Sequence, residues 1–489
     1  MTVNSILEKI ISLVKNRYFC GFLFAAALWL MVWSTYNTDI TRLLVPGFPH
    51  NALDLIHGLR SLLPFVAVVL ALVFLFKKRR LPENFFLTPM GLLLIYAILG
   101  SISSVFSKEP FMALYWSALY GIVILVLLAV LTSPEPLKKL SLIININWAI
   151  AGILTIALLV FFLIQPGVLS SFHANFLICY QRPYESLGNV PAALQTFGMV
   201  GTRPTGWGRY AGVMAIIALA SFFYNKKYLK IIWFLLFIIS LFILLFSRGR
   251  TEIVAFIFAA IFVIWLAKKI NIFSIFGICF LSLLSVFIVF YSIPCTNSFG
   301  FISYFIPKNI TIYPIQIQKN SNVVPSNQNS ANVVPSNQNS ANDLALKSIK
   351  DIFTLSGRID GVWIDAGRLF MNNPLVGYGF QADRFFLNGQ HAHNTILQVL
   401  IQTGIFGTIP FLLAFVFTFI ILYKLFKKNM LEDRERYFLI AITAALVFFA
   451  VRSITESVAF FSADWLFVAP IIAYIQCLND NKLMKSHEN

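Results

Sequence analysis

A chain of 489 residues that is 58% hydrophobic and only 12% charged is not a soluble protein of ordinary composition, because soluble domains carry roughly a quarter of their residues as charges. The composition, with a mean hydropathy of +0.80, predicts a polytopic membrane protein of all-α fold. The net charge of +17 does not indicate a nucleic-acid partner, since the basic residues lie in short loops between apolar runs.

The apolar runs predict about twelve transmembrane helices, because a spanning helix needs roughly 20 largely apolar residues. The first run is too long to be a cleavable signal peptide. We therefore expect nine spans within 1–291 and three within 395–489, the last followed by a cytoplasmic tail. The expected spans lie near 18–36, 62–76, 88–106, 113–132, 141–164, 209–224, 230–246, 251–267, 272–291, 395–423, 438–455 and 463–479.

The loops between these spans predict the orientation. Lysine-rich clusters at 77–80, 138–139, 226–230, 268–269 and 424–436 all fall on one side if the count of twelve is right. Basic loops face the cytoplasm, so this side and both termini are expected there. Arginine predominates on the opposite side, where its planar fork of donors suits phosphate and carboxylate groups.

Two long outer segments are expected in the periplasm, at about 165–208 and 292–394. The second is a loop domain carrying short helices, and it contains a ten-residue duplication at 322–331 and 332–341. The composition of this insert, about 319–343, predicts disorder because it cannot bury a core. Cys179 and Cys295 fall in these two segments, and their spacing leaves open whether they pair.

An amphipathic helix is expected over about 356–371. Apolar residues recur there at helical spacing, from Ile359 to Phe370, and Arg358 and Arg368 lie on or near the polar side. The plain alternative is that these arginines form a solvated charged face. A turn-forming stretch with Gly377 and Gly379 follows.

A histidine pair, His391 and His393, stands directly before the apolar run that begins at Thr395. Histidine changes protonation state near neutral pH, so a general base or an anion contact is one reading. Structural interfacial histidines and a metal site are the alternatives. No carboxylate or cysteine cluster joins the pair, and we expect no metal.

Two short outer turns place charge close to the acyl boundary, where it is costly unless paired or functional. The first contains Arg248 and Arg250, and Glu252 is the alternative partner that would neutralise one of them. The second contains Arg452 and Glu456, whose spacing of four allows them to pair with each other.

These motifs together resemble the signature of O-antigen ligases and related polymerases, which are bacterial inner-membrane glycosyltransferases. The resemblance rests on about 50 residues and on the Ser247-Arg248-Gly249 turn. Its motifs are Ser356-Gly-Arg358 with Trp363, Asn373-Pro-Leu-x-Gly377-x-Gly379, and His391-Ala-His393-Asn394 followed by Gln398, Gly404 and Gly407.

The resemblance implies a glycan donor carried on undecaprenyl pyrophosphate, an acceptor sugar on the lipid A core, and a periplasmic reaction without cofactor or metal. By motif position, His393 is the candidate base, with His391 beside it. Arg248 would bind the pyrophosphate, helped by Arg203, Arg209 and Arg358. Residues expected to support the site are Asn394, Arg250, Gly377 and Gly379.

Three other functions share part of this pattern. A polymerase extending lipid-linked repeats and a protein O-oligosaccharyltransferase would use the same donor and differ only in the acceptor. A transporter of lipid-linked sugars predicts ionisable residues near mid-membrane. The apolar runs here are almost free of charge, which disfavours transport.

Overall fold

The computed structural model describes residues 24–26, 28, 68–69, 71–72, 75, 84–164, 204–225, 227–246, 250–267, 362–387, 391–427, 431–457 and 462–488. Within these ranges the chain is helical and has no strand. The expected all-α class is thereby confirmed. The duplicated insert, both loop cysteines and the start of the expected amphipathic helix lie outside the described residues.

Nine long helices in the described part of the chain coincide with nine of the expected spans. The expected spans at 18–36, 62–76 and 272–291 lie wholly or almost wholly outside it. The long helices are α5 (Pro89–Ser103), α6 (Pro110–Leu131), α7 (Pro136–Ile164), α10 (Pro204–Tyr224), α11 (Lys227–Phe246), α12 (Arg250–Ala267), α17 (Thr395–Lys427), α18 (Asp433–Arg452) and α19 (Ser462–Glu488). Four short helices accompany them: η2 (Phe85–Leu87), η3 (Ser104–Phe106), α15 (Ile364–Asn372) and α16 (Ala382–Phe386).

Five of the described helices are long and apolar enough to cross a membrane, judged by length and composition. They are α5, α6, α7, α11 and α17, and the apolar parts of α10 and α12 are shorter. This supports an integral membrane protein, whereas the number twelve stays a prediction. Many large apolar side chains on α11 and α17 are exposed, among them Ile231, Leu235 and Ile409, as a lipid-facing surface requires.

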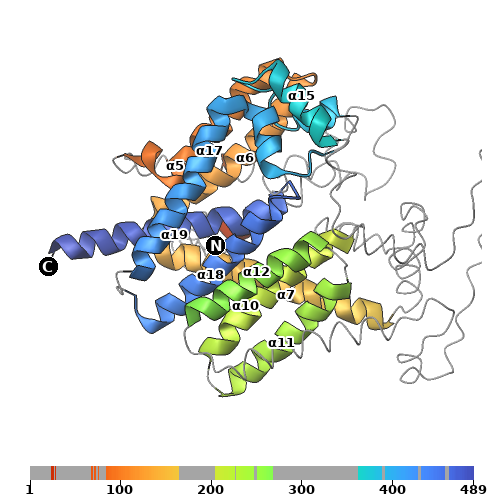
Figure 1. The fold of residues 1–489 in the computed structure, drawn as a ribbon. Coiled ribbons are helices and arrows are strands. Elements are labelled where there is room, and N and C mark those ends of the chain that lie inside the picture. The colour runs from red at the N-terminus through yellow and green to blue at the C-terminus, as the bar shows by residue number, and fades with distance from the viewer. Residues whose placement is uncertain are drawn as a thin grey trace, which may run out of the picture.

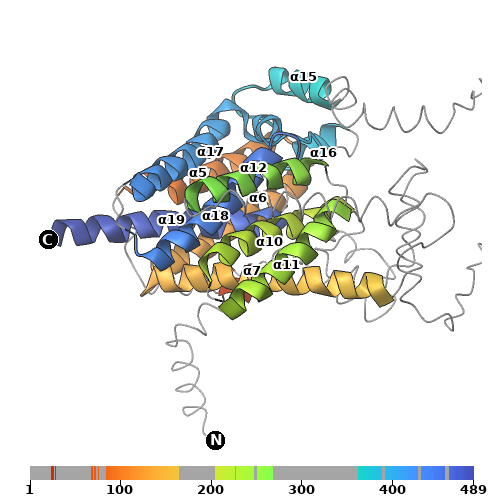
Figure 2. The same cartoon turned by 60° about the horizontal axis from the view of Figure 1, so that its bottom comes forward.

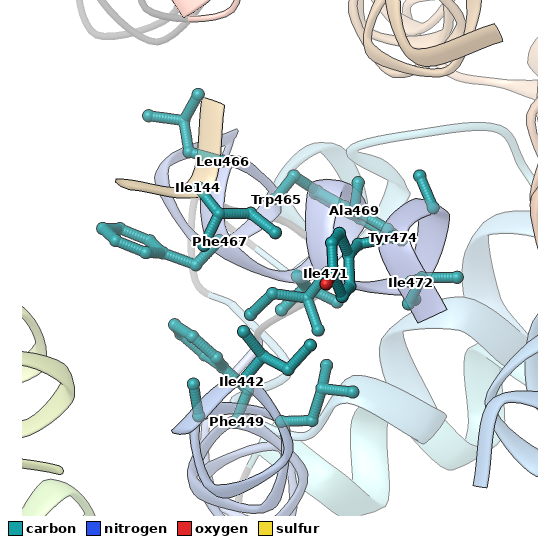
Figure 3. Close-up of a cluster of buried hydrophobic side chains, with 14 of the residues drawn as sticks. Ile144, Ile442, Phe449, Trp465, Leu466, Phe467, Ala469, Ile471, Ile472 and Tyr474 are labelled. Carbon is teal, nitrogen blue, oxygen red and sulfur yellow. The ribbon is translucent and has the colours of Figure 1, made fainter. Parts of the chain in front are cut away.

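The helices form two groups joined by α18 and α19 (Figure 1). One group contains α5, α6 and α17, and the other contains α7, α10, α11 and α12. Helix α19 packs on both groups, while α18 packs mainly on α12 and α10. Phe449 of α18 stacks on Phe467 of α19 with ring centroids 6.1 Å apart, and Ile442 of α18 belongs to the same buried apolar layer (Figure 3). Helix α15 lies on the edge of the bundle, beyond α17 (Figure 2).

Helix α17 is interrupted at Gly404, where the backbone leaves the helical region with φ 58° and ψ −163°. An interruption frees backbone groups that must find partners inside a membrane protein. The segment 374–379 supplies them. Tyr378 N and Gly379 N donate to the carbonyls of residues 401 and 402 at 2.9 and 2.7 Å, and the N–H groups of residues 405 and 406 donate back to the carbonyls of residues 374 and 375.

The glycines of this motif are required by close approach of two backbones. Gly377, Gly379 and Gly404 all have positive φ, at 75°, 81° and 58°, a region that costs other residues strain. A Cβ on Gly377 would lie 2.6 Å from the backbone nitrogen of Gly404, and one on Gly404 would collide with the Leu375 carbonyl. The Gly-x-Gly stretch and Gly404 therefore form one structural unit.

Phe380 follows this unit and inserts into the bundle between α5 and α6. Its ring stacks on Tyr120 at 4.4 Å and meets the edge of Tyr96 at 5.3 Å. Gly100 of α5 makes room, since a Cβ there would collide with the Phe380 ring. The outer segment is thus anchored in the core immediately before α16.

Replacing Gly404 with alanine is expected to destabilise the protein by at least ~1–3 kcal/mol, because both the positive φ and the Leu375 contact oppose a side chain. The free energy of unfolding in mixed micelles measures this. Gly121→Ala is the matched control, since a Cβ on Gly121 of α6 meets nothing within 4 Å; we expect it to be neutral or slightly stabilising. Equal effects of the two substitutions would contradict the structural role of Gly404.

Candidate active site

Several helix ends meet at one end of the bundle. The start of α17 is tied to the turn after α18 by two hydrogen bonds, Thr395 N to Ser453 O and Thr395 Oγ1 to Glu456 O, both 2.9 Å. Thr455 of the same turn contacts Thr251, at the start of α12, through their hydroxyl groups at 2.9 Å. The starts of α12 and α17 therefore lie together around residues 453–457.

His393 lies at this junction, held by an acidic side chain from a distant part of the chain. Its Nδ1 is 3.2 Å from Glu456 Oε2, and its side chain is 34% exposed. With Nδ1–H donating to the carboxylate, Nε2 carries the lone pair, and the described residues give it no hydrogen-bond partner. His393 also has a positive φ of 49°, a strained conformation that clusters at functional sites. The ring is therefore held in place through one of its two nitrogens.

Asn394 fixes the backbone beside His393 by capping α17. Its Oδ1 accepts from Leu397 N at 2.8 Å, the usual contact of an N-cap side chain with the third helical residue. Its Nδ2 donates to Ile454 O at 2.9 Å. The Asn394 amide thus caps one free N–H at the start of α17 and ties this helix start to the turn that carries Glu456. Its role in the structure is to fix the backbone beside His393.

His391 has a different environment. Its Nδ1 lies 3.2 Å from Oδ2 of Asp383, and its Nε2 accepts from two guanidinium nitrogens of Arg384, Nε at 2.9 Å and Nη2 at 2.5 Å. Arginine offers only donors, so Nε2 holds the lone pair and Nδ1 holds the proton. His391 is therefore neutral and occupied on both sides.

Burial lowers the pKa of His391 from its ordinary value of 6.5. The Asp383 carboxylate opposes this shift, while the proximity of Arg384 and His393 adds to it. The lowered pKa agrees with the hydrogen bonds, because both favour the uncharged ring. The two histidines of the motif therefore differ. Nε2 of His391 accepts from Arg384, whereas the described residues give Nε2 of His393 no hydrogen-bond partner.

Four alternating charges are buried beneath this end of the bundle. Arg452, 1% exposed, donates to Glu252 at 3.1 Å and to Asp464 at 2.9 Å. Arg209 of α10 lies 3.2 Å from the other oxygen of Asp464. The two cations and two anions compensate one another, which allows their burial. They join α10, α12, α18 and α19 at the level of the site.

One ion pair considered from sequence spacing, between Arg452 and Glu456, does not form in the described part of the chain. Arg452 forms no ion pair with Glu456 among the described contacts, although Glu456 N donates to the Arg452 carbonyl at 3.0 Å just past the end of α18. Instead Arg452 pairs with Glu252 and Asp464, and Glu456 binds His393. Glu252 is therefore the partner of a distant arginine, and the side chains of Arg248 and Arg250 lie outside the described residues.

The expected phosphate-binding residues are only partly visible. Arg203, Arg248 and Arg358 lie outside the described residues, and Arg250 is described only as the start of α12. Arg209 is buried and ion-paired. Gly377 and Gly379 hold the interruption in α17. In the described part of the chain no group of three or more His, Cys, Asp or Glu residues is arranged to hold a metal ion.

Four partners were missed in the sequence: Asp383, Arg384, Glu456 as the residue that holds His393, and Asp464. Asp383 and Arg384 could have been noticed only weakly, because two charged residues in a largely apolar outer segment suggest that they have polar partners there. Asp464 lies within an apolar run, which also indicates a buried partner. Nothing local indicates that Glu456 meets His393 across 63 residues.

The fold and site define a class of protein. It is an all-helical membrane protein in which a carboxylate holds a histidine at the start of an interrupted helix. Residues 234–412 match the family model described as O-antigen ligase. This match supports assignment of the chain to the O-antigen ligase family and confirms the resemblance seen in its motifs. No curated protein matches the chain.

Replacing Arg452 with methionine is expected to destabilise the protein by about 3–5 kcal/mol, because Glu252 and Asp464 would remain buried without their shared cation. Equilibrium unfolding in mixed micelles measures the change. Arg368→Met is the control: this arginine of α15 is 76% exposed and pairs only with Asp365, three residues earlier. Exposed pairs contribute little, so a comparable loss in the control would refute the buried role of Arg452.

Proposed function

We propose that the protein transfers a glycan from undecaprenyl pyrophosphate to a sugar of the lipid A core, at the periplasmic face of a bacterial inner membrane. The observation that supports this most directly is the His393–Glu456 pair at the start of α17. A glycosyl transfer to a hydroxyl group needs a base that accepts one proton. Nε2 of His393 would supply the lone pair, because Glu456 binds the other ring nitrogen and the side chain is 34% exposed.

In the proposed step the acceptor hydroxyl oxygen attacks the anomeric carbon of the donor sugar. The new bond forms as the bond from that carbon to the pyrophosphate oxygen breaks. The hydroxyl proton passes to His393 Nε2, and the electron pair leaves with undecaprenyl pyrophosphate. Glu456 stabilises the imidazolium that forms and keeps the ring in the productive tautomer, a role carboxylates fill beside catalytic histidines.

Charge develops on the departing pyrophosphate, and Arg248 is the residue we propose to stabilise it. Chain connectivity supports this choice. Thr251 contacts Thr455, the neighbour of Glu456, so the turn that carries Arg248 and Arg250 runs into the same end of the bundle. Arg203 and Arg358 are further candidates for this contact. The pairing of Arg209 with Asp464 favours a structural role for that residue.

The arrangement of helix ends supports the proposed sidedness. The lysine-rich loops at 138–139, 226–230 and 424–436 adjoin the helix ends opposite the site: the starts of α7, α11 and α18. Basic loops face the cytoplasm, and the site would then face the periplasm. Both termini are proposed to be cytoplasmic. A polymerase or a protein glycosyltransferase would share this site and differ in the acceptor.

His393→Ala is expected to lower glycan transfer by roughly 10²–10⁴-fold, the usual contribution of a general base. Glu456→Gln should lower kcat by a smaller factor, about 10- to 100-fold, because an amide orients the ring less firmly and does not stabilise its charge. Transfer is measured in proteoliposomes that contain only this protein, the lipid-linked donor and the acceptor lipid.

Two controls complete this experiment. Unfolding curves of both variants show whether the fold is intact, and Arg368→Ala shows the effect of removing an exposed charge. Near-normal transfer by His393→Ala would refute the assignment of the base. Replacing the core acceptor with a lipid-linked repeat unit tests the polymerase alternative, since a ligase transfers to the core acceptor and not to the repeat unit.

A further inference from the structure

A buried carboxylate lies behind the histidine loop, which we define as residues 391–394. Asp383 of α16 is 0% exposed. Its Oδ2 accepts from His391 Nδ1 at 3.2 Å, from the backbone nitrogen of Ala392 at 3.3 Å and from Gln398 Nε2 at 3.2 Å. Two of these donors belong to the histidine loop and the third to the start of α17. A single oxygen therefore joins α16, the loop and α17.

Stability of the fold does not by itself require a carboxylate at this position. A buried charge costs free energy that hydrogen bonds must offset, and well-packed apolar side chains are often at least as stabilising as a buried ionic group. The surroundings are suitably apolar, since Ala382, Ala392 and Ile401 form a small buried cluster with Ala366. What a carboxylate adds is one acceptor on which three donors from separate segments converge.

The histidine loop contains a strained residue beside this acceptor. His393 has a φ of 49°, and a residue other than glycine keeps such a value only where the surrounding structure determines it. On the C-terminal side, Asn394 is bound to the start of α17 and to the carbonyl of Ile454. On the N-terminal side, the bond from Ala392 N to Asp383 fixes the preceding peptide. His393 is thus held from both sides.

The direction of the His393 ring depends on this backbone conformation. The ring meets Glu456 through Nδ1, 3.2 Å from the carboxylate. If the loop relaxed to an ordinary φ, the side chain would leave the backbone in another direction and lose the carboxylate that fixes its tautomer. No hydrogen bond joins Asp383 to His393 in the described part of the chain, so the influence of Asp383 passes through the backbone.

We propose that Asp383 is the positioning residue for His393. Through Ala392 and Gln398 it holds the histidine loop in the conformation in which His393 meets Glu456. The inference rests on the proposed glycan transfer, in which His393 Nε2 takes the proton of the acceptor hydroxyl group. In this role Asp383 exchanges no proton. It acts because a catalytic group must be held within about 0.5 Å of its productive position.

Two substitutions at Asp383 separate this role from a requirement for charge. Asp383→Ala removes all three bonds and should lower kcat by about 10- to 100-fold with little change in KM, as loss of an orienting outer residue commonly does. Oδ1 of Asp383 has no hydrogen-bond partner among the described residues. An asparagine can therefore place its oxygen at the position of Oδ2 and its amide group at Oδ1, so Asp383→Asn should recover most of the lost kcat.

A graded variant and a matched control accompany these substitutions in the proteoliposome assay. Gln398→Leu removes one of the three donors and should lower kcat by less than Asp383→Ala does. Asp365→Asn is the control, because this carboxylate of α15 is 59% exposed and pairs with Arg368; it should change neither kcat nor KM. Unfolding curves show which variants are folded. If Asp383→Ala does not fold, Gln398→Leu decides the matter, and a wild-type kcat in that variant would overturn the inference.

A double-mutant cycle tests whether Asp383 acts through His393. In the His393→Ala background there is no base to position. The further change Asp383→Ala should then lower the residual transfer by less than about 2-fold, because residues that act as a unit have non-additive effects. Losses that multiply would show that Asp383 supports binding or the fold, and they would overturn the inference. A wild-type kcat in folded Asp383→Ala would do the same.

The ring position can also be measured without transfer. In protein with ¹⁵N-labelled histidine, the ring-nitrogen signals report the tautomer, and their loss in His393→Gln identifies those of His393. At a pH where the ring is neutral, the wild type should show the Nδ1–H tautomer, and Asp383→Ala should show a mixture of both. An unchanged tautomer would contradict the positioning role. Absence of transfer by the wild-type protein would contradict the proposed function, and the tautomer would still decide whether Asp383 positions the ring.

Discussion

The site depends on one backbone requirement, which is that an interrupted helix inside a membrane protein must have its free N–H and C=O groups satisfied. In α17 the interruption at Gly404 is closed by the segment 374–379. That segment is followed at once by Phe380, which is buried between α5 and α6. Helix α16 and the histidine loop are therefore attached to the bundle on both sides. His391 is held by Asp383 of α16, and His393, at the start of α17, is held by Glu456.

The second interaction that fixes the position of the site is electrostatic. Arg452 brings Glu252 and Asp464 together, so the ends of α12, α18 and α19 converge in one place. Those ends adjoin the turn with Glu456 and, through it, His393. A buried group of this kind costs desolvation and is weak as a source of stability, although breaking it is expensive. Its value here is that it sets the relative positions of helices that contribute residues to the site.

Much of the fold could be predicted because helix class and location follow from apolar runs and loop charges. The nine expected spans that fall in the described residues all coincide with helices. The family could be recognised because its motifs are local: the glycine unit, the histidine pair and the arginine turn each lie within a few residues. The histidine chosen as the base has a side chain that is 34% exposed, and its role stays a prediction.

The pairing of side chains could not be predicted, because it is made across long separations. Arg452 lies 200 residues from Glu252, and His393 lies 63 residues from Glu456. Local spacing favoured Glu456 as the partner of Arg452, whereas Arg452 forms its ion pairs with the distant Glu252 and with Asp464. The two glycines expected to support the site, Gly377 and Gly379, shape the backbone that closes the interruption in α17. They allow the close backbone contact with α17, so they affect the position of the site only through the backbone.

The closure of α17 also bears on how the protein moves substrates. In transporters with discontinuous helices, unwound backbone groups line the path and coordinate the ions that drive transport. Here the carbonyls of Ile401 and Gln402 and the N–H groups of Ile405 and Phe406 are already bound to the protein's own loop. The interruption is filled from within the chain, so these four described backbone groups are not available to line a passage. Substrates would meet at the surface of such a bundle and exchange groups there, each remaining anchored by its own lipid.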